Sequence, residues 1–149
     1  MISMRQNIPS LFTVAILACF MLCHVAPAIA EEGKIIKIDA VKNDTSATLT
    51  IDPAELAIEK DVIVIWLNSI VDQEVNVLFQ HKELPAAAVT DSMGFGPDKN
   101  GAYAAKYLPF IATASLRFIE TGTYSYTVEM KNGTCAARGT IIVDSPTGP

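Results

Sequence analysis

The chain has 149 residues, of which 50% are hydrophobic and 18% are charged, and its formal net charge at pH 7 is −5. This length is ordinary for a single domain. An acidic balance of charge argues against nucleic acid and anionic lipid, since both repel a negative surface, and we therefore expect no nucleic-acid partner.

Residues 1–30 have the features of a secretory signal peptide. Arg5 precedes the apolar run LFTVAILACFMLCHVAPAIA, which closes on the small-x-small site Ala28-Ile29-Ala30 before the charged stretch EEGK. We predict cleavage after Ala30, one domain over residues 31–149, and a periplasmic or secreted location without stable membrane insertion after cleavage. An uncleaved anchor is the alternative, because the run approaches the length that spans a bilayer.

Cleavage leaves few side chains that bind metal or form disulfides. Cys19, Cys23 and His24 leave with the signal, so the mature domain keeps one cysteine, Cys135, and one histidine, His81. No disulfide can then form within one molecule. In an oxidising compartment Cys135 is buried, bound to metal or paired with a second chain, and burial inside a strand is the simplest of these.

Short strands separated by turns follow along the domain. Their boundaries are turn residues such as Pro53, Thr121-Gly122 and Asn132-Gly133. The predicted strands are KIIKIDA, SATLTID, AELAIEK, DVIVIWLN, EVNVLFQ, TASLRFIE, GTYSYTVEM and ARGTIIVD. Without a long amphipathic helical pattern, the fold class is all-β: a Greek-key β-sandwich of about seven to eight strands with one long loop.

Two of these strands carry core residues of particular interest. The run Val62–Leu67 is apolar on both faces, which predicts a central strand buried on both sides or nearly so. Trp66 within this run is expected in the core. In GTYSYTVEM, Tyr124 and Tyr126 alternate with polar residues and should share one face of a strand.

The segment from 80 to 112 lacks the strand pattern. It contains several prolines and glycines, yet it is too apolar for a disordered linker, and loops of this length are usually functional. Within it, AYAAKYL is compatible with a short helix. Its aromatic side chains either cover one end of the sandwich or form a surface for a partner or ligand. The candidate partner-binding residues are Phe95, Tyr103, Tyr107 and Phe110.

Three stretches, IDPAELAIEKDVIVIWLNSIVDQEVNVLF, TASLRFIETGTYSYTVEM and GTIIVD, resemble the cupredoxin family, which includes plastocyanin-type and pseudoazurin-type proteins. The resemblance covers most of residues 51–144 and implies a cupredoxin-like sandwich. In that family two histidines and a cysteine bind copper trigonally, often with a distant axial methionine. The matching histidine, cysteine and second histidine positions hold Val75, Val128 and Lys131 in this sequence.

We therefore expect a cupredoxin-like binding or interaction module that lacks a type 1 copper site and needs no cofactor. Its partner would be a protein or a small molecule. Enzymatic activity is not expected, because the sequence has no nucleophile motif, HExxH, phosphate-binding glycine loop or CxxC.

Two alternatives stay open at this point. The first is a copper-binding or electron-transfer protein with a non-standard site formed by His81, Met93, Met130 and Cys135, because these soft ligands suit Cu(I). The second is a structural or assembly subunit that dimerises through Cys135.

Overall fold

The computed structural model describes residues 33–42, 47–80 and 84–145, which all belong to the compact unit Glu31–Pro149. The predicted signal peptide, residues 1–30, and the candidate ligand His81 lie outside the described residues. Within the described ranges, no helix is both long enough and apolar enough to cross a membrane.

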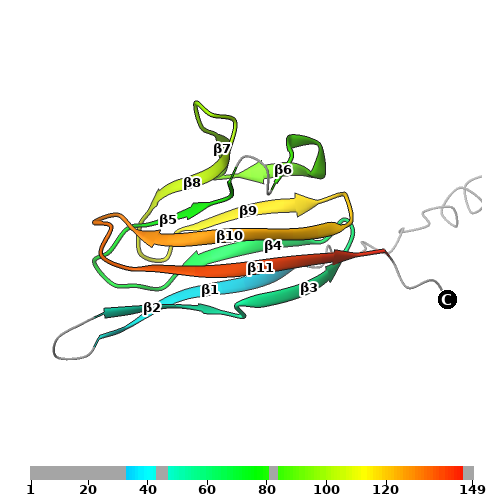
Figure 1. Ribbon diagram of the computed structural model, residues 1–149. Helices are drawn as coiled ribbons and strands as arrows, with labels where there is room; N and C mark the ends of the chain where they lie inside the picture. The colour runs from blue at the N-terminus through cyan, green and yellow to red at the C-terminus, as the bar shows by residue number, and fades with distance from the viewer. Residues whose placement is uncertain (1–32, 43–46, 81–83, 146–149) are drawn as a thin grey trace, which may run out of the picture. The chain divides into compact units, whose positions relative to one another are not determined.

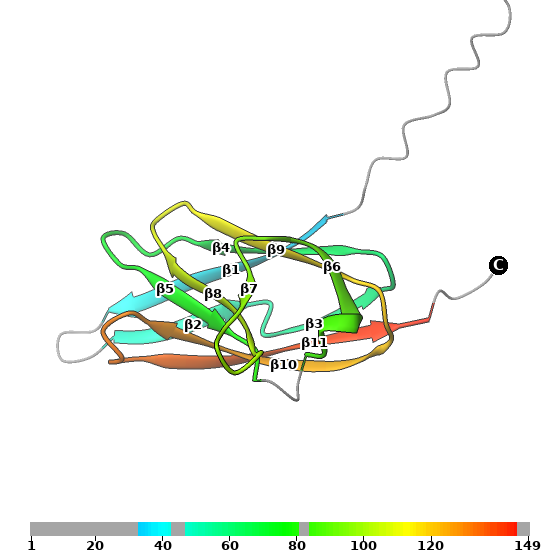
Figure 2. The same cartoon turned by 90° about the horizontal axis from the view of Figure 1, so that it is seen from above.

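The described residues form eleven strands in two sheets (Figures 1 and 2). Sheet A contains β1 (Gly33–Lys42), β2 (Ala47–Asp52), β4 (Ile63–Asn68), β6 (Val89–Met93) and β9 (Thr113–Phe118), in the order β2-β1-β4-β9-β6. Sheet B contains β3 (Glu55–Glu59), β5 (Val75–Leu78), β7 (Gly96–Pro97), β8 (Tyr103–Leu108), β10 (Gly122–Met130) and β11 (Ala136–Asp144), in the order β3-β11-β10-β5-β8-β7. The chain crosses repeatedly between the sheets, and the predicted β-sandwich is confirmed.

The segment from 80 to 112 is not one long loop. It contains the 3-10 turn η2 (Ala86–Ala88) and the strands β6, β7 and β8, so the sandwich has eleven strands rather than seven or eight. AYAAKYL, which is compatible with a short helix in the sequence, instead contains β8, which pairs antiparallel with β5. The helical preference of its alanines is weak, and pairing with β5 satisfies the backbone hydrogen bonds of both strands.

Aromatic side chains fill the space between the sheets. Trp66 is fully buried, as predicted, and its ring centroid lies 5.8 Å from Phe79, 5.1 Å from Phe95 and 5.5 Å from Tyr126, each in an edge-to-face arrangement. Gly139 of β11 makes room for this packing, because a Cβ there would overlap the Tyr126 ring.

Strand β4 differs from its prediction on one face. Val64 and Trp66 are buried between the sheets, whereas Ile63, Ile65 and Leu67 lie on the outer face of sheet A and are only half-buried. Of the predicted burial on both sides or nearly so, full burial therefore holds for the inner face, and the outer face is half-buried. A two-layer sandwich buries one face of each sheet, and nothing among the described residues forms a third layer over sheet A.

Candidate functional site

Three connections between strands meet at one end of the sandwich, at the left in Figures 1 and 2: β4–β5, β8–β9 and β10–β11. Val75, Val128 and Lys131 lie at or next to these connections. This is therefore the end at which the cupredoxin resemblance leads us to expect a functional site.

Asn68, the last residue of β4, ties two of the connections together. Its side chain is fully buried, and its Nδ2 donates hydrogen bonds to the carbonyl oxygens of Gln73 and Leu108, both at 2.9 Å. Its Oδ1 accepts a hydrogen bond from the Ile70 N–H at 3.0 Å. One buried side chain thus satisfies backbone groups of both the β4–β5 turn and the end of β8.

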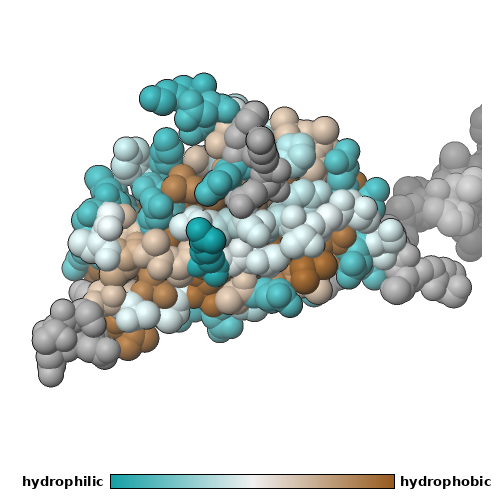
Figure 3. Space-filling view, viewed as in Figure 1, coloured by the Kyte–Doolittle hydropathy of each residue, from teal (hydrophilic) through white to brown (hydrophobic). Residues whose placement is uncertain are grey.

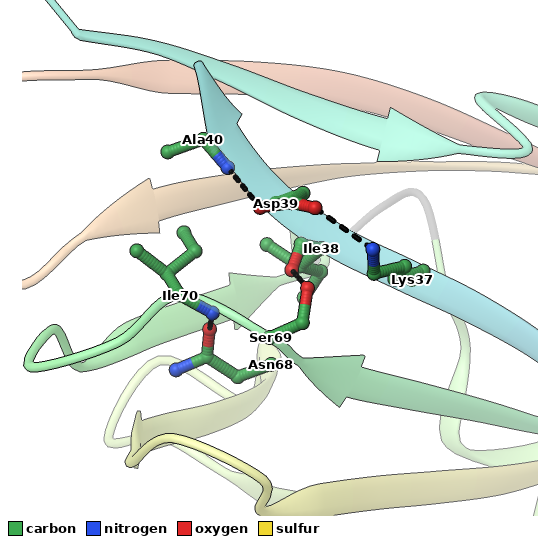
Figure 4. A network of polar contacts seen from close by, with 7 residues as sticks. All are labelled: Lys37, Ile38, Asp39, Ala40, Asn68, Ser69 and Ile70. Carbon is green, nitrogen blue, oxygen red and sulfur yellow. Dashed lines mark hydrogen bonds and ion pairs between the residues drawn. The ribbon is translucent and has the colours of Figure 1, made fainter. Parts of the chain in front are cut away.

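The next residue fixes the same turn to sheet A (Figure 4). The backbone N–H and the Oγ of Ser69 both donate to the carbonyl oxygen of Ile38 in β1, at 2.9 and 2.7 Å. The neighbouring Lys37 and Asp39 form an ion pair at 2.8 Å, and the hydrogen bond from Lys37 holds the pKa of Asp39 below its ordinary value. The start of the β4–β5 turn is therefore held by the Asn68 side chain and by the hydrogen bonds of Ser69 to β1.

Three non-glycine residues around Asn68 have left-handed backbone conformations: Asp72 (φ 57°), Tyr107 (φ 58°) and Ile111 (φ 67°). Aspartate tolerates this region, but for a β-branched isoleucine it is an outlier. Hydrogen bonds impose the strain, since the Ile111 N–H donates to the Asn68 carbonyl at 2.8 Å and the Tyr107 N–H to Asn76 Oδ1 at 2.9 Å. Strain of this kind costs about 1–3 kcal/mol per residue and is typical of functional sites.

Four exposed hydrophobic side chains lie on the β4–β5 connection, the end of β8 and the β8–β9 connection. We call these four side chains the apolar tip. Its members are Val71, Tyr107, Phe110 and Ile111, which are 56%, 58%, 44% and 67% exposed. Tyr107 and Ile111 are thus both strained and exposed. Neither property stabilises the fold.

A charged pair borders the apolar tip. Lys131 Nζ lies 2.7 Å from Glu74 Oε2 and 5.2 Å from the centroid of the Tyr107 ring. The hydrogen bond to Glu74 is the main reason that the pKa of Lys131 is raised above its ordinary value. An open groove of about 500 Å³ beside this pair is lined by Asp72, Gln73, Glu74, Lys131 and Asn132.

The positions that hold copper ligands in the resembling family are occupied differently here. Val75 and Val128 are fully buried on neighbouring strands, where Val75 pairs with Met130 and Val128 with Val77. Neither valine has an atom that can coordinate a metal. Lys131 is exposed and paired with Glu74, as described above.

The four candidate ligands of a non-standard copper site do not all share one place. Met130 and Cys135 lie in the same turn, where the Met130 N–H donates to the Cys135 carbonyl at 3.0 Å. Met93 lies on β6 of the other sheet, is 64% exposed, and pairs with Ser115. Figures 1 and 2 both place β6 away from the β10–β11 turn. Among the described residues, no three His, Cys, Asp or Glu side chains are grouped so that they could hold a metal ion.

Cys135 is half-buried just before β11 rather than inside a strand. Its Sγ donates a hydrogen bond to the carbonyl oxygen of Ala47, at the start of β2, at 2.9 Å. This contact joins the β10–β11 turn to sheet A.

The predicted partner-binding residues divide between surface and core. Tyr107 and Phe110 belong to the apolar tip, whereas Phe95 is buried against Trp66 and Tyr103 is half-buried in β8. Sequence reasoning missed Val71, Ile111 and the buried Asn68. The sequence offers one signal for Asn68, which is a polar residue at the end of an apolar run. It offers no signal for the positive φ of Ile111.

No protein-family model matches the chain, and no curated protein sequence matches it. Among solved structures, the chain is similar to the reduced Cu(I) form of a proline-to-glycine mutant of amicyanin, with 20% identity over 78% of this chain and 87% of that one and a TM-score of 0.45. The Cu(I) form of a methionine-to-glutamine mutant and a reduced tryptophan-to-tyrosine mutant of amicyanin each match at 19% identity over the same shares, with a TM-score of 0.47. The solved structures that this chain resembles are therefore those of amicyanin. This likeness says nothing about the metal, partner or activity of the chain itself.

Proposed function

We propose that this chain is an exported, non-enzymatic binding module whose apolar tip docks on the surface of a partner protein. The observation that supports this most directly is Ile111, a β-branched side chain that is 67% exposed on a left-handed backbone. A glycine or asparagine at this position would relieve the strain, and a polar side chain would remove the exposed apolar area. Neither stability nor solubility accounts for isoleucine here, whereas contact with a partner does.

The surroundings of the tip suit a protein surface. Apolar side chains at its centre, with the Lys131–Glu74 pair and polar turn residues around them, match the apolar core and polar rim of protein interfaces. The Asn68 hydrogen bonds hold both connections in place before binding, which lowers the entropy cost of association. The partner should offer an apolar patch with its own polar rim.

We propose further that this binding does not use type 1 copper. Buried Val75 and Val128 support this, because the two strand positions contribute packing and no donor atom. Titration of the purified protein with Cu(II), followed by absorption in the blue-copper region, tests the proposal. A strong thiolate-to-copper band would overturn it, and a response to Cu(I) lost in Cys135→Ser would favour the non-standard site instead.

The docking proposal is tested by cross-linking in the exporting host. A photoreactive phenylalanine analogue at position 110 should form a defined adduct with one partner. Ile111→Asp should abolish that adduct, while Thr123→Asp, on the outer face of sheet B and remote from the tip, should leave it unchanged. An adduct of equal yield in Ile111→Asp would show that the tip is not the docking surface.

A further inference from the structure

The outer face of sheet A carries a row of four paired side chains, of which Ile35, Ile65 and Met93 are apolar and Ser115 is polar. Met93 of β6 pairs with Ser115 of β9, Ser115 with Ile65 of β4, and Ile65 with Ile35 of β1. Paired residues point to the same side of a sheet, so these four side chains share the outer face. Ile35 is 59% exposed and Met93 is 64% exposed.

Neighbouring rows extend this apolar area. Ile63 and Leu67 of β4 flank Ile65 on the same face, and Gly33, which pairs with Ile63, adds no side chain that would cover it. The centre of the face is therefore the isoleucine and leucine side chains of β4, while the neighbouring strand β9 contributes the polar Thr113, Ser115 and Arg117. Within the described part of the chain nothing is packed over it.

The outer face of sheet B provides a comparison within the same molecule. Its central strand β10 turns Thr123, Ser125, Thr127 and Glu129 outward, as expected for a face in water. Figure 3 looks onto this face, and the side chains that cross its middle are pale, neither strongly hydrophobic nor strongly hydrophilic. Ile142 and Leu78 lie opposite Thr123 and Thr127, so this face carries some apolar side chains as well, but its strand β10 is polar outward whereas β4, the central strand of sheet A, is apolar outward.

We propose that two copies of this chain associate through the outer faces of their A sheets. Sheets with the same twist pack face to face with their strands roughly aligned, so one sheet is complementary in shape to a second copy of itself. A two-fold axis along the strands would place the β1–β2 edge of one copy over the β9–β6 edge of the other. Such isologous contacts are the commonest form of oligomer interface.

The charges on this face permit the arrangement. On the β1–β2 side, Lys37 pairs with Asp39 at 2.8 Å, and Asp52 lies opposite Lys37 in the register. On the β9–β6 side, Arg117 pairs with Asp91 at 2.6 Å. The axis along the strands would place the more acidic side of one copy over the side of its partner where Arg117 and Asp91 balance each other, and would separate the two acidic sides.

The area sets the expected strength. Five strands about 4.8 Å apart and about six residues long give a face of roughly 20 Å by 20 Å. With the relief of its side chains, each copy would bury about 500–600 Å², and the pair about 1,000–1,200 Å², near the lower limit of specific interfaces. Interfaces of this size are typical of weak association, so we expect a dimer that dissociates on dilution and is distinct from any disulfide-linked pair.

Sedimentation equilibrium of the exported protein tests this proposal. The N-terminus of that protein is first determined by mass spectrometry. The wild type should pass from monomer to dimer with rising concentration. Ile35→Lys and Met93→Lys, both at exposed positions, should each weaken association at least tenfold, because each places a charge within the contact, Ile35 beside the central strand β4 and Met93 on the edge strand β6. Thr123→Lys, on the outer face of sheet B, should leave it unchanged.

A second measurement maps the contact without substitutions. On dilution, backbone amide resonances of β1 and β4 should shift while those of β10 stay in place. If the protein remains monomeric up to about 1 mM, the proposal is overturned. This holds whether the face is covered by another protein or by none. A dimer that persists in Ile35→Lys, or that dissociates in Cys135→Ser, overturns it as well. Ile111→Asp should leave the dimer intact, so a failure of tip docking can be told apart from a failure of dimerisation.

Discussion

Replacing Asn68 with alanine should destabilise the protein strongly and loosen the apolar tip. The substitution removes three side-chain hydrogen bonds, to the backbone of Gln73, Leu108 and Ile70, from a site that is fully buried. Each lost bond costs about 1–1.5 kcal/mol, and more where the former partner stays buried and unpaired, so the total is about 3–5 kcal/mol. For a domain of this size that corresponds to a fall in melting temperature of roughly 10–20 °C.

Urea unfolding followed by tryptophan fluorescence measures this change, because Trp66 is fully buried and is the protein's single tryptophan. Asn76→Ala serves as a control, since it removes one hydrogen bond, to the exposed backbone of Tyr107, and should cost less than about 1 kcal/mol. Asn68→Asp gives a sharper comparison. It keeps the acceptor for Ile70 but turns a carboxylate oxygen toward two carbonyl oxygens, so it should be at least as damaging as alanine near neutral pH.

The loss in Asn68→Asp should partly recover under acidic conditions, where the protonated carboxyl group can donate one of the two missing hydrogen bonds. A folded Asn68→Ala variant that loses less than about 1 kcal/mol would refute this account. It would mean that the two connections hold their positions without the asparagine side chain.

Four further outcomes follow from other parts of the structure. Ile111→Gly should stabilise the fold by about 1 kcal/mol, since it relieves the left-handed strain, yet weaken partner capture; a loss of stability in urea unfolding would contradict the strain argument. Gly139→Ala should destabilise by about 3 kcal/mol or more, because its Cβ meets the Tyr126 ring, and calorimetry would show the lowered melting temperature. Burial raises the pKa of Tyr126 to about 12, so the folded chain holds the phenolic proton more tightly than the unfolded chain. The resulting contribution to the free energy of unfolding is complete below about pH 10 and is lost toward pH 12, a change of roughly 2–3 kcal/mol. Tyr126→Phe should remove this change from the pH dependence of unfolding. The Cys135 thiol, half-buried and bonded to Ala47, should react slowly with a thiol reagent in the native protein and rapidly after unfolding; an immediate native reaction would contradict the contact.

The sequence by itself determined the class of fold and most of its strands. Alternation of apolar and polar residues is a local property, so it located β10 and β11, and it placed Trp66 in the core. The residues at the positions that match copper ligands in the resembling family, Val75 and Val128, were also readable without coordinates. The two-sheet sandwich then confirmed the prediction, and both valines proved to be core residues.

Only the tertiary structure decided what the segment from 80 to 112 does. Its strands exist because β5 and β9, distant in sequence, offer them edges, and weak local preferences cannot compete with that pairing. Phe95 and Phe110 look alike in the sequence, yet one packs against Trp66 and the other faces water. The hydrogen bond from Asn68 to Leu108 spans 40 residues, and contacts of that range, rather than any local pattern, fix the two connections that expose the apolar tip.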